Sequence, residues 1–217
     1  MAERLDRRQA RTKQLLRKAL LEIIAEKGVD GITVTDISNR ADVNRGTFYL
    51  HYQDAPDMLR QIMNEIIMSL FALMQEMDPV VMRQYAVKDI PYPNLVRLLT
   101  EFANNADFLK VMLGPKGDPS FAQQIMTEFT SRISNRLAYW QPSDENMLIP
   151  RDYLIAYISS ANFGVVKYWL ETDIKLTPEE VTLILMRVSN LGPMSMTGLP
   201  NKNLIDTAKS SDVHGTP

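Results

Sequence analysis

The sequence predicts an all-α protein with a small N-terminal unit of three helices and a larger helical body. Apolar residues recur at spacings of three and four along most of the chain, which is the period of helices buried on one face. Several of these segments begin with proline, which is tolerated in the first turn of a helix and disruptive later. No segment alternates apolar and polar residues as a half-buried strand would.

The composition excludes several classes of protein. With 217 residues, 45% of them hydrophobic, the chain is long enough to bury a core. It has no cysteine and two histidines, which excludes a disulfide framework and argues against a zinc site. No stretch approaches the roughly 20 apolar residues of a membrane span. We therefore expect a cytoplasmic protein with no metal, no cofactor and no membrane partner.

Charge is unevenly distributed, although the net charge is only −2. Residues 1–18 carry seven basic side chains against Glu3 and Asp6, so the remainder is acidic. A basic arm on an acidic body suits a protein that meets phosphate groups with one end only. A solvated helix face would give the same charge run, so charge alone leaves both interpretations open.

Helix signals define the N-terminal unit. A first helix is expected from about Thr12 to Lys27, with Gly28 as its stop. The run Thr33-Val34-Thr35-Asp36 fits a capping box for the second helix, whose inward stripe is Val34, Ile37 and Ala41. Asn44 can cap a short third helix over 45–51.

The larger helical body is expected to begin with a long fourth helix. Asp54 and Asp57 can cap it near Ala55-Pro56, and its apolar period persists to Asp78-Pro79, a length that suits a connector between two domains. Further helices are expected at about 94–105, 107–113, 119–140, 151–171 and 177–191, with Pro93, Pro119, Pro150 and Pro178 marking four of the junctions. The expected domains are 1–54, 55–192 and a disordered tail over 193–217.

Two short helices joined by Asp42-Val43 predict a helix-turn-helix, whose second helix can enter a major groove about 12 Å wide. We expect its inward side to consist of Val43, Phe48 and Tyr52, packed against Ile37, Ala41 and the first helix.

The outward residues have side chains that suit DNA. Arg45 can donate a bidentate pair to guanine or clamp a phosphate, and Gly46 lets the backbone approach closely. Thr47, Tyr49 and His51 each supply a directed donor for phosphate oxygens. The alternative for Tyr49 and His51 is local packing.

These residues resemble the helix-turn-helix of the TetR family, the tetracycline-repressor-like regulators. The resemblance covers residues 12–59 and rests on the runs 31–37 and 40–52. It implies a homodimer with an all-helical ligand-binding domain, in which ligand changes the separation of two DNA-reading helices. The candidate DNA-binding residues are Thr33, Thr35, Asn44, Arg45, Gly46, Thr47, Tyr49 and His51.

The sequence departs from the family pattern at two positions. Asp42 stands where the family usually has glycine, and aspartate tolerates the left-handed backbone that such a turn needs. Ala55 stands where the family commonly has a lysine that reaches a phosphate. The basic arm before Thr12 can replace this contact.

Residues 100–192 resemble a C-terminal domain type that is frequent in regulators from Gram-positive bacteria, through the runs 108–110, 117–121 and 167–170. In the wider family the last two long helices form a four-helix dimer interface, here Asp152 to Glu171 and Pro178 to Leu191. The candidate interface residues are Tyr153, Ala156, Tyr157, Ser160, Gly164 and Tyr168. An ordinary intramolecular core would produce the same stripe.

We therefore expect a ligand-responsive repressor that binds a pseudo-palindromic operator in double-stranded DNA as a homodimer. Thirteen methionines suit a pliable pocket for a small-molecule effector with an apolar part, although core filling explains most of them. An enzyme is not expected, because His51 lies in the recognition helix and His214 in the tail. The alternative is a protein–protein adapter or coactivator that keeps the same fold.

Overall fold

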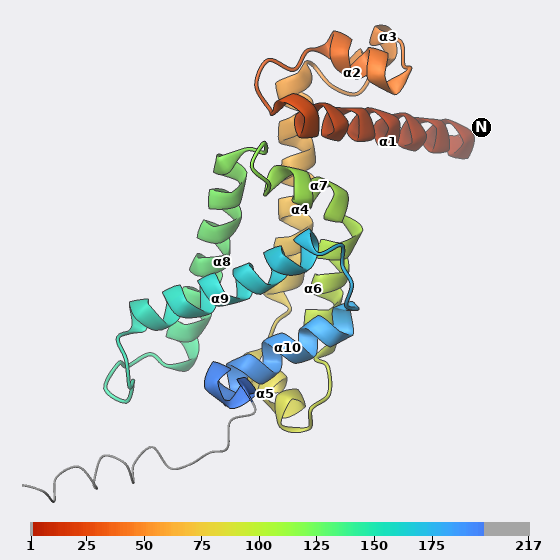
Figure 1. The fold of residues 1–217 in the computed structure, drawn as a ribbon. Coiled ribbons are helices and arrows are strands. Elements are labelled where there is room, and N and C mark those ends of the chain that lie inside the picture. The colour runs from red at the N-terminus through yellow and green to blue at the C-terminus, as the bar shows by residue number, and fades with distance from the viewer. Residues whose placement is uncertain (1, 198–217) are drawn as a thin grey trace, which may run out of the picture.

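The computed structural model describes residues 2–197, which contain helices and no strand, so the predicted all-α class is confirmed. Helices α1 to α3 form a small unit at one end of the molecule, and α4 runs from it into the larger body (Figure 1). In chain order the elements are α1 (Ala2–Lys27), α2 (Val34–Ala41), α3 (Arg45–Tyr49), α4 (Ala55–Gln75), α5 (Pro79–Val87), α6 (Pro93–Asn104), α7 (Ala106–Met112), α8 (Pro119–Trp140), α9 (Arg151–Glu171), α10 (Pro178–Leu191) and the 3-10 helix η1 (Pro193–Thr197).

The predicted caps are present at the starts of three helices. Thr33 Oγ1 accepts from the Asp36 backbone N–H at 3.1 Å, and Asp36 Oδ2 accepts from the Thr33 N–H at 3.1 Å. Asn44 accepts from the Gly46 N–H at 2.8 Å, and Asp54 from the Asp57 N–H at 2.7 Å. Each helix start is therefore specified by residues within one turn of it.

Three helix boundaries differ from those predicted. Helix α1 begins at Ala2 instead of near Thr12, because residues 2–11 contain no helix breaker, so the basic arm is part of a continuous helix. Helix α3 ends at Tyr49 and not at His51, and α4 ends at Gln75.

The body contains one helix that was not predicted, α5. Asp78 Oδ1 accepts from the backbone N–H groups of Val80 and Val81, and Pro79 occupies the first turn, so the same two residues that suggested a stop begin a new helix. Residues 193–197 of the expected tail form η1, and residues 198–217 lie outside the described residues.

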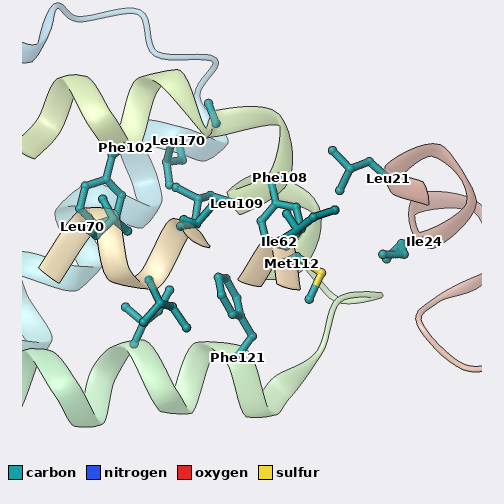
Figure 2. Close-up of a cluster of buried hydrophobic side chains, with 14 of the residues drawn as sticks. Leu21, Ile24, Ile62, Leu70, Phe102, Phe108, Leu109, Met112, Phe121 and Leu170 are labelled. Atoms are coloured by element: carbon teal, nitrogen blue, oxygen red, sulfur yellow. The ribbon is translucent and has the colours of Figure 1, made fainter. Parts of the chain in front are cut away.

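A single apolar core extends from α1 to α10. Figure 2 shows Leu21 and Ile24 of α1 at the end of the cluster where Met112 of α7 lies. Phe108 of α7 and Phe121 of α8 meet edge to face, with ring centroids 5.7 Å apart. The core therefore joins the N-terminal unit to the body without a break.

No helix within residues 2–197 is long and apolar enough to cross a membrane.

The capping box of α2 can be tested by two substitutions. Thr33→Ala should lower the free energy of unfolding by about 1 kcal/mol, because a side-chain cap is lost. Hydrogen bonds from the Thr33 hydroxyl, from the Thr33 backbone and then from Lys27 hold the pKa of Asp36 below its usual value. The stability from Asp36 is therefore full above the unfolded pKa of about 3.9 and is lost as pH falls through the lower folded pKa.

Urea titrations at pH 7 and pH 3 measure this contribution. The difference in stability between wild type and Asp36→Asn should shrink at the lower pH. An equal difference at both values would contradict the assignment.

Candidate nucleic-acid interface

The turn between α2 and α3 has the geometry of a helix-turn-helix. Asp42 ends α2 with φ of 52°, in the left-handed region, and the Val43 N–H donates to the Ser38 carbonyl at 2.9 Å. The predicted inward side is confirmed: Phe48 is fully buried and Tyr52 nearly so, against the buried Ile37 and Ala41, and Val43 is half-buried. Burial also raises the pKa of the Tyr52 hydroxyl. One side of α3 is thereby fixed in the core, and its other side faces outward.

Four of the eight candidate DNA-binding residues present free polar side chains. Within the described residues, the side chains of Arg45, Thr47, Tyr49 and His51 form no hydrogen bond or ion pair. Tyr49 is 58% exposed, although its ring contacts Phe48 edge to face at 5.7 Å. Tyr49 thus combines local packing with a free hydroxyl, which is what a phosphate contact needs.

Two of the candidate residues are already occupied by helix capping. The Thr33 hydroxyl accepts from the Asp36 N–H and donates to the Asp36 carboxylate at 2.9 Å. The Asn44 side-chain oxygen accepts from Gly46, and a Cβ at residue 46 would lie 3.2 Å from that oxygen. Gly46 therefore makes room for the cap as well as for close approach of the backbone, and Thr35 is left as a half-buried residue in the first turn of α2.

A cluster of charges braces α2 against α1. The Arg40 guanidinium donates to both carboxylate oxygens of Glu26 at 2.8 Å and reaches Glu22 at 3.5 Å. This pairing raises the pKa of Arg40 and lowers that of Glu26. Lys27 adds a bond to Asp36 at 3.2 Å. Helix α2, which the turn at Asp42 joins to the recognition helix, is therefore held against α1.

Two cations join α1 to the body. Arg17, midway along α1, donates to Asp107 at 3.0 Å and Asn105 at 3.3 Å, and its guanidinium lies 5.5 Å from the centroid of the Phe108 ring. Lys116, in the loop after α7, donates to the carbonyls of residues 25 and 26 at 3.0 and 2.7 Å. These carbonyls belong to the last turn of α1, where a positive charge is favourable.

The link at Arg17 continues into the body through side chains. Asn105 donates to Glu101 at 3.0 Å, and Ser69 of α4 donates to the same Glu101 oxygen at 2.7 Å. A polar network therefore connects α1 to α6 and α4, and the position of the helix-turn-helix depends on these helices.

A recognition helix with free polar groups, carried by a bundle attached to a larger helical body, defines a DNA-binding transcriptional regulator of the helix-turn-helix class. Residues 16–62 match the family model described as "Bacterial regulatory proteins, tetR family", and residues 89–191 match "Transcriptional regulator C-terminal region". The chain belongs to the TetR family of transcriptional regulators.

Individual proteins are similar to this chain in sequence or in fold. An uncharacterized HTH-type transcriptional regulator of Bacillus subtilis (strain 168), YxbF, is 41% identical over 59 residues, which are 27% of this chain but only 16% of that protein. A TetR regulator from Streptococcus agalactiae 2603V is 25% identical, with a TM-score of 0.53 over 87% of this chain and 98% of that one. The regulator FadR from Bacillus subtilis, solved with stearoyl-CoA, has a TM-score of 0.51 at 17% identity over 82% of this chain and 98% of its own.

The link between α1 and the body can be tested by a double-mutant cycle. Arg17→Gln and Asp107→Asn should show a coupling free energy of about 0.5–1 kcal/mol in denaturant titrations, because the pair is partly exposed. If Arg17 positions the recognition helix, Arg17→Gln should also weaken DNA binding. Lys110→Gln, which removes the ion pair to Asp173 within the body, should leave DNA binding unchanged. Equal DNA affinities for Arg17→Gln and wild type would rule out a positioning role.

Proposed function

We propose that this protein is a ligand-responsive repressor that binds a pseudo-palindromic operator as a homodimer. The observation that carries the proposal is the outward side of α3, where Arg45, Thr47 and Tyr49 have no hydrogen-bond or ion-pair partner in the described residues, while the buried Phe48 fixes the inward side. Polar side chains left free on a rigidly held helix favour a ligand that supplies acceptors, and the major groove and phosphates of DNA do so.

The residues divide into two roles. Arg45, at the first position of α3, reads bases, because a guanidinium can bond both acceptors of guanine. Thr47, Tyr49 and His51 bind phosphate oxygens and set the register. Thr35 acts beside them from the start of α2, and Thr33 and Asn44 contribute mainly through capping.

Selection from random duplexes followed by anisotropy titrations tests these roles. Arg45→Ala should cost about 1–3 kcal/mol on the selected operator and relax the preference at its base pair, whereas Tyr49→Phe should weaken binding to all sequences alike. Unchanged affinity and preference in both variants would overturn the assignments. No enriched sequence, even at low salt, would favour a protein–protein adapter instead.

The dimer is supported by the position of the stripe on α9. All six candidate interface residues are exposed in the single chain, with Tyr153, Tyr157 and Tyr168 exposed by 73%, 52% and 69%. The opposite face of α9 supplies Ile155, Val166, Trp169 and Leu170 to the core. The stripe therefore lies outside the core of the subunit, and small residues between tyrosines suit close packing against a second copy about a two-fold axis.

Gly164 offers a test that separates folding from dimerisation. A Cβ at this position would meet no atom within 4 Å in the single chain. Gly164→Ala should therefore stabilise an isolated subunit by about 0.5–1 kcal/mol, since glycine is a poor helix former. Gly164→Arg starts from the same free Cβ position on an exposed part of α9, so the subunit should still fold, but the long side chain should prevent close packing with a partner.

Light scattering at micromolar concentration measures the outcome. Wild type and the control Gln124→Arg, on the exposed part of α8, should be dimers, and Gly164→Arg should be a monomer with native helicity. A monomeric wild type would contradict the proposal.

The packing of α8 supports the proposed coupling of effector to DNA. Its buried Phe121 contacts Phe108 of α7, which lies beside Arg17 of α1. A shift of α8 on ligand binding can therefore reach α1 through two contacts. A groove of about 570 Å³ lies between α8 and α9 and is lined in part by Met126, Thr130 and Ile155. This groove leaves space into which α8 can shift.

A further inference from the structure

Arg132 of α8 is an unusual residue in the body of the protein. Its guanidinium carbon lies 4.8 Å from the centroid of the Phe71 ring. Phe71 belongs to α4, and its side chain is buried. Its Nε is buried and has no hydrogen-bond partner. The side chain as a whole is partly exposed, so a positive charge lies against α4 with no carboxylate bound to it in the described part of the chain.

The other partly buried arginines among residues 7–197 all have partners. Arg17 and Arg151 bond carboxylates, and Arg136 donates to the carbonyl of residue 75 at the end of α4. Arg132 makes no hydrogen bond or ion pair within the described residues. Glu128, one helical turn earlier, is exposed and lies beyond ion-pair distance, so the nearest acidic group on α8 does not neutralise Arg132.

The surroundings do not supply a carboxylate from the next turn either. Arg136 lies four residues further along α8 and adds a second positive charge to this side of the helix. Asp78, which lines a small pocket of about 290 Å³ with Arg136, uses its Oδ1 to cap α5 and forms no ion pair with any arginine of the described residues. A partly buried arginine with free N–H groups gains from an oxyanion that accepts from them, because charge-assisted hydrogen bonds are strong in such surroundings.

We propose that Arg132 is the anion-binding residue of an effector site between α4 and α8, and that the effector is a carboxylate or phosphate monoester with an apolar part. The planar guanidinium matches either oxyanion with two parallel hydrogen bonds. The Phe71 ring supplies an apolar surface next to the bound charge. This inference rests on the proposal that the helical body binds an effector.

The position of Arg132 gives such a ligand a route to the DNA-binding unit. Phe71 belongs to α4, the helix that leads directly from the helix-turn-helix into the body. Arg132 belongs to α8, whose first turn packs on α7 through Phe121. A ligand that draws Arg132 towards itself therefore acts on α4, which leads to the helix-turn-helix, and on α8, which reaches α1 through α7.

Binding of simple probes to the full-length protein, without DNA, tests the site. Octanoate and octyl phosphate carry the two anions, and octan-1-ol is their neutral counterpart of equal chain length. By calorimetry, wild type should bind both anions more tightly than the alcohol. Arg132→Gln should weaken anion binding about tenfold or more, as expected for loss of a charge-assisted hydrogen bond, and leave binding of the alcohol unchanged.

Two controls keep the test specific. Arg97→Gln removes an exposed arginine that pairs with Glu76, so it changes the net charge equally and should bind all three probes as wild type does. Arg132→Lys keeps the charge but loses the bidentate geometry, and it should bind the anions with intermediate affinity. Circular dichroism of each variant checks that the helices are intact.

Three results would each overturn the anion site. They are equal affinity of wild type for octanoate, octyl phosphate and octan-1-ol, unchanged anion binding by Arg132→Gln, and no binding of any probe to wild type. DNA titrations with and without octanoate are a separate measurement. If octanoate binds through Arg132 but leaves DNA affinity unchanged, the anion site is supported and the ligand-responsive part of the proposed function is contradicted.

Discussion

The contact between α1 and α7 is the constraint on which the arrangement of the molecule depends. One side of α1 packs against the helix-turn-helix, and the other side carries Leu21 and Ile24 towards Met112 (Figure 2). Apolar burial gives this contact its strength but little direction. Arg17 at the middle of α1 and Lys116 at its end supply the direction, because each must reach particular oxygens. Two polar anchors on one rigid helix fix the orientation of everything that the helix carries.

The sequence predicted those parts of the fold that short-range chemistry determines. Thr33, Asn44 and Asp54 each cap a helix through a partner two or three residues away, so the motif is visible in the sequence. Helix α5 was missed because Asp78-Pro79 is equally typical of the end of one helix and the start of the next. The extent of α1 was missed because a run of charges gives no apolar period.

The contacts that build the site from distant parts of the chain could not be predicted. Arg17 and Asp107 are separated by 90 residues, and nothing in the sequence distinguishes this aspartate from the other acidic residues. Likewise, the period of the α9 stripe is the same for a core and for an interface, and only the exposure of Tyr153 and Tyr168 places it on the surface. The residues on the outward side of α3 could be predicted, because the apolar positions of that short helix must face the core and leave only one side for polar residues.

The uneven distribution of charge, noted first in the sequence, acquires a spatial meaning in the fold. The basic first half of α1 lies in the same end of the molecule as α2 and α3 (Figure 1), while the acidic residues predominate in the rest of the chain. Such a molecule has an electrostatic dipole along its length, and the field of a DNA duplex turns it before contact. Wrongly oriented encounters are repelled by the acidic body. The search for a binding site on DNA is thereby biased towards productive collisions, and the rate of association is set by ionic strength as well as by diffusion.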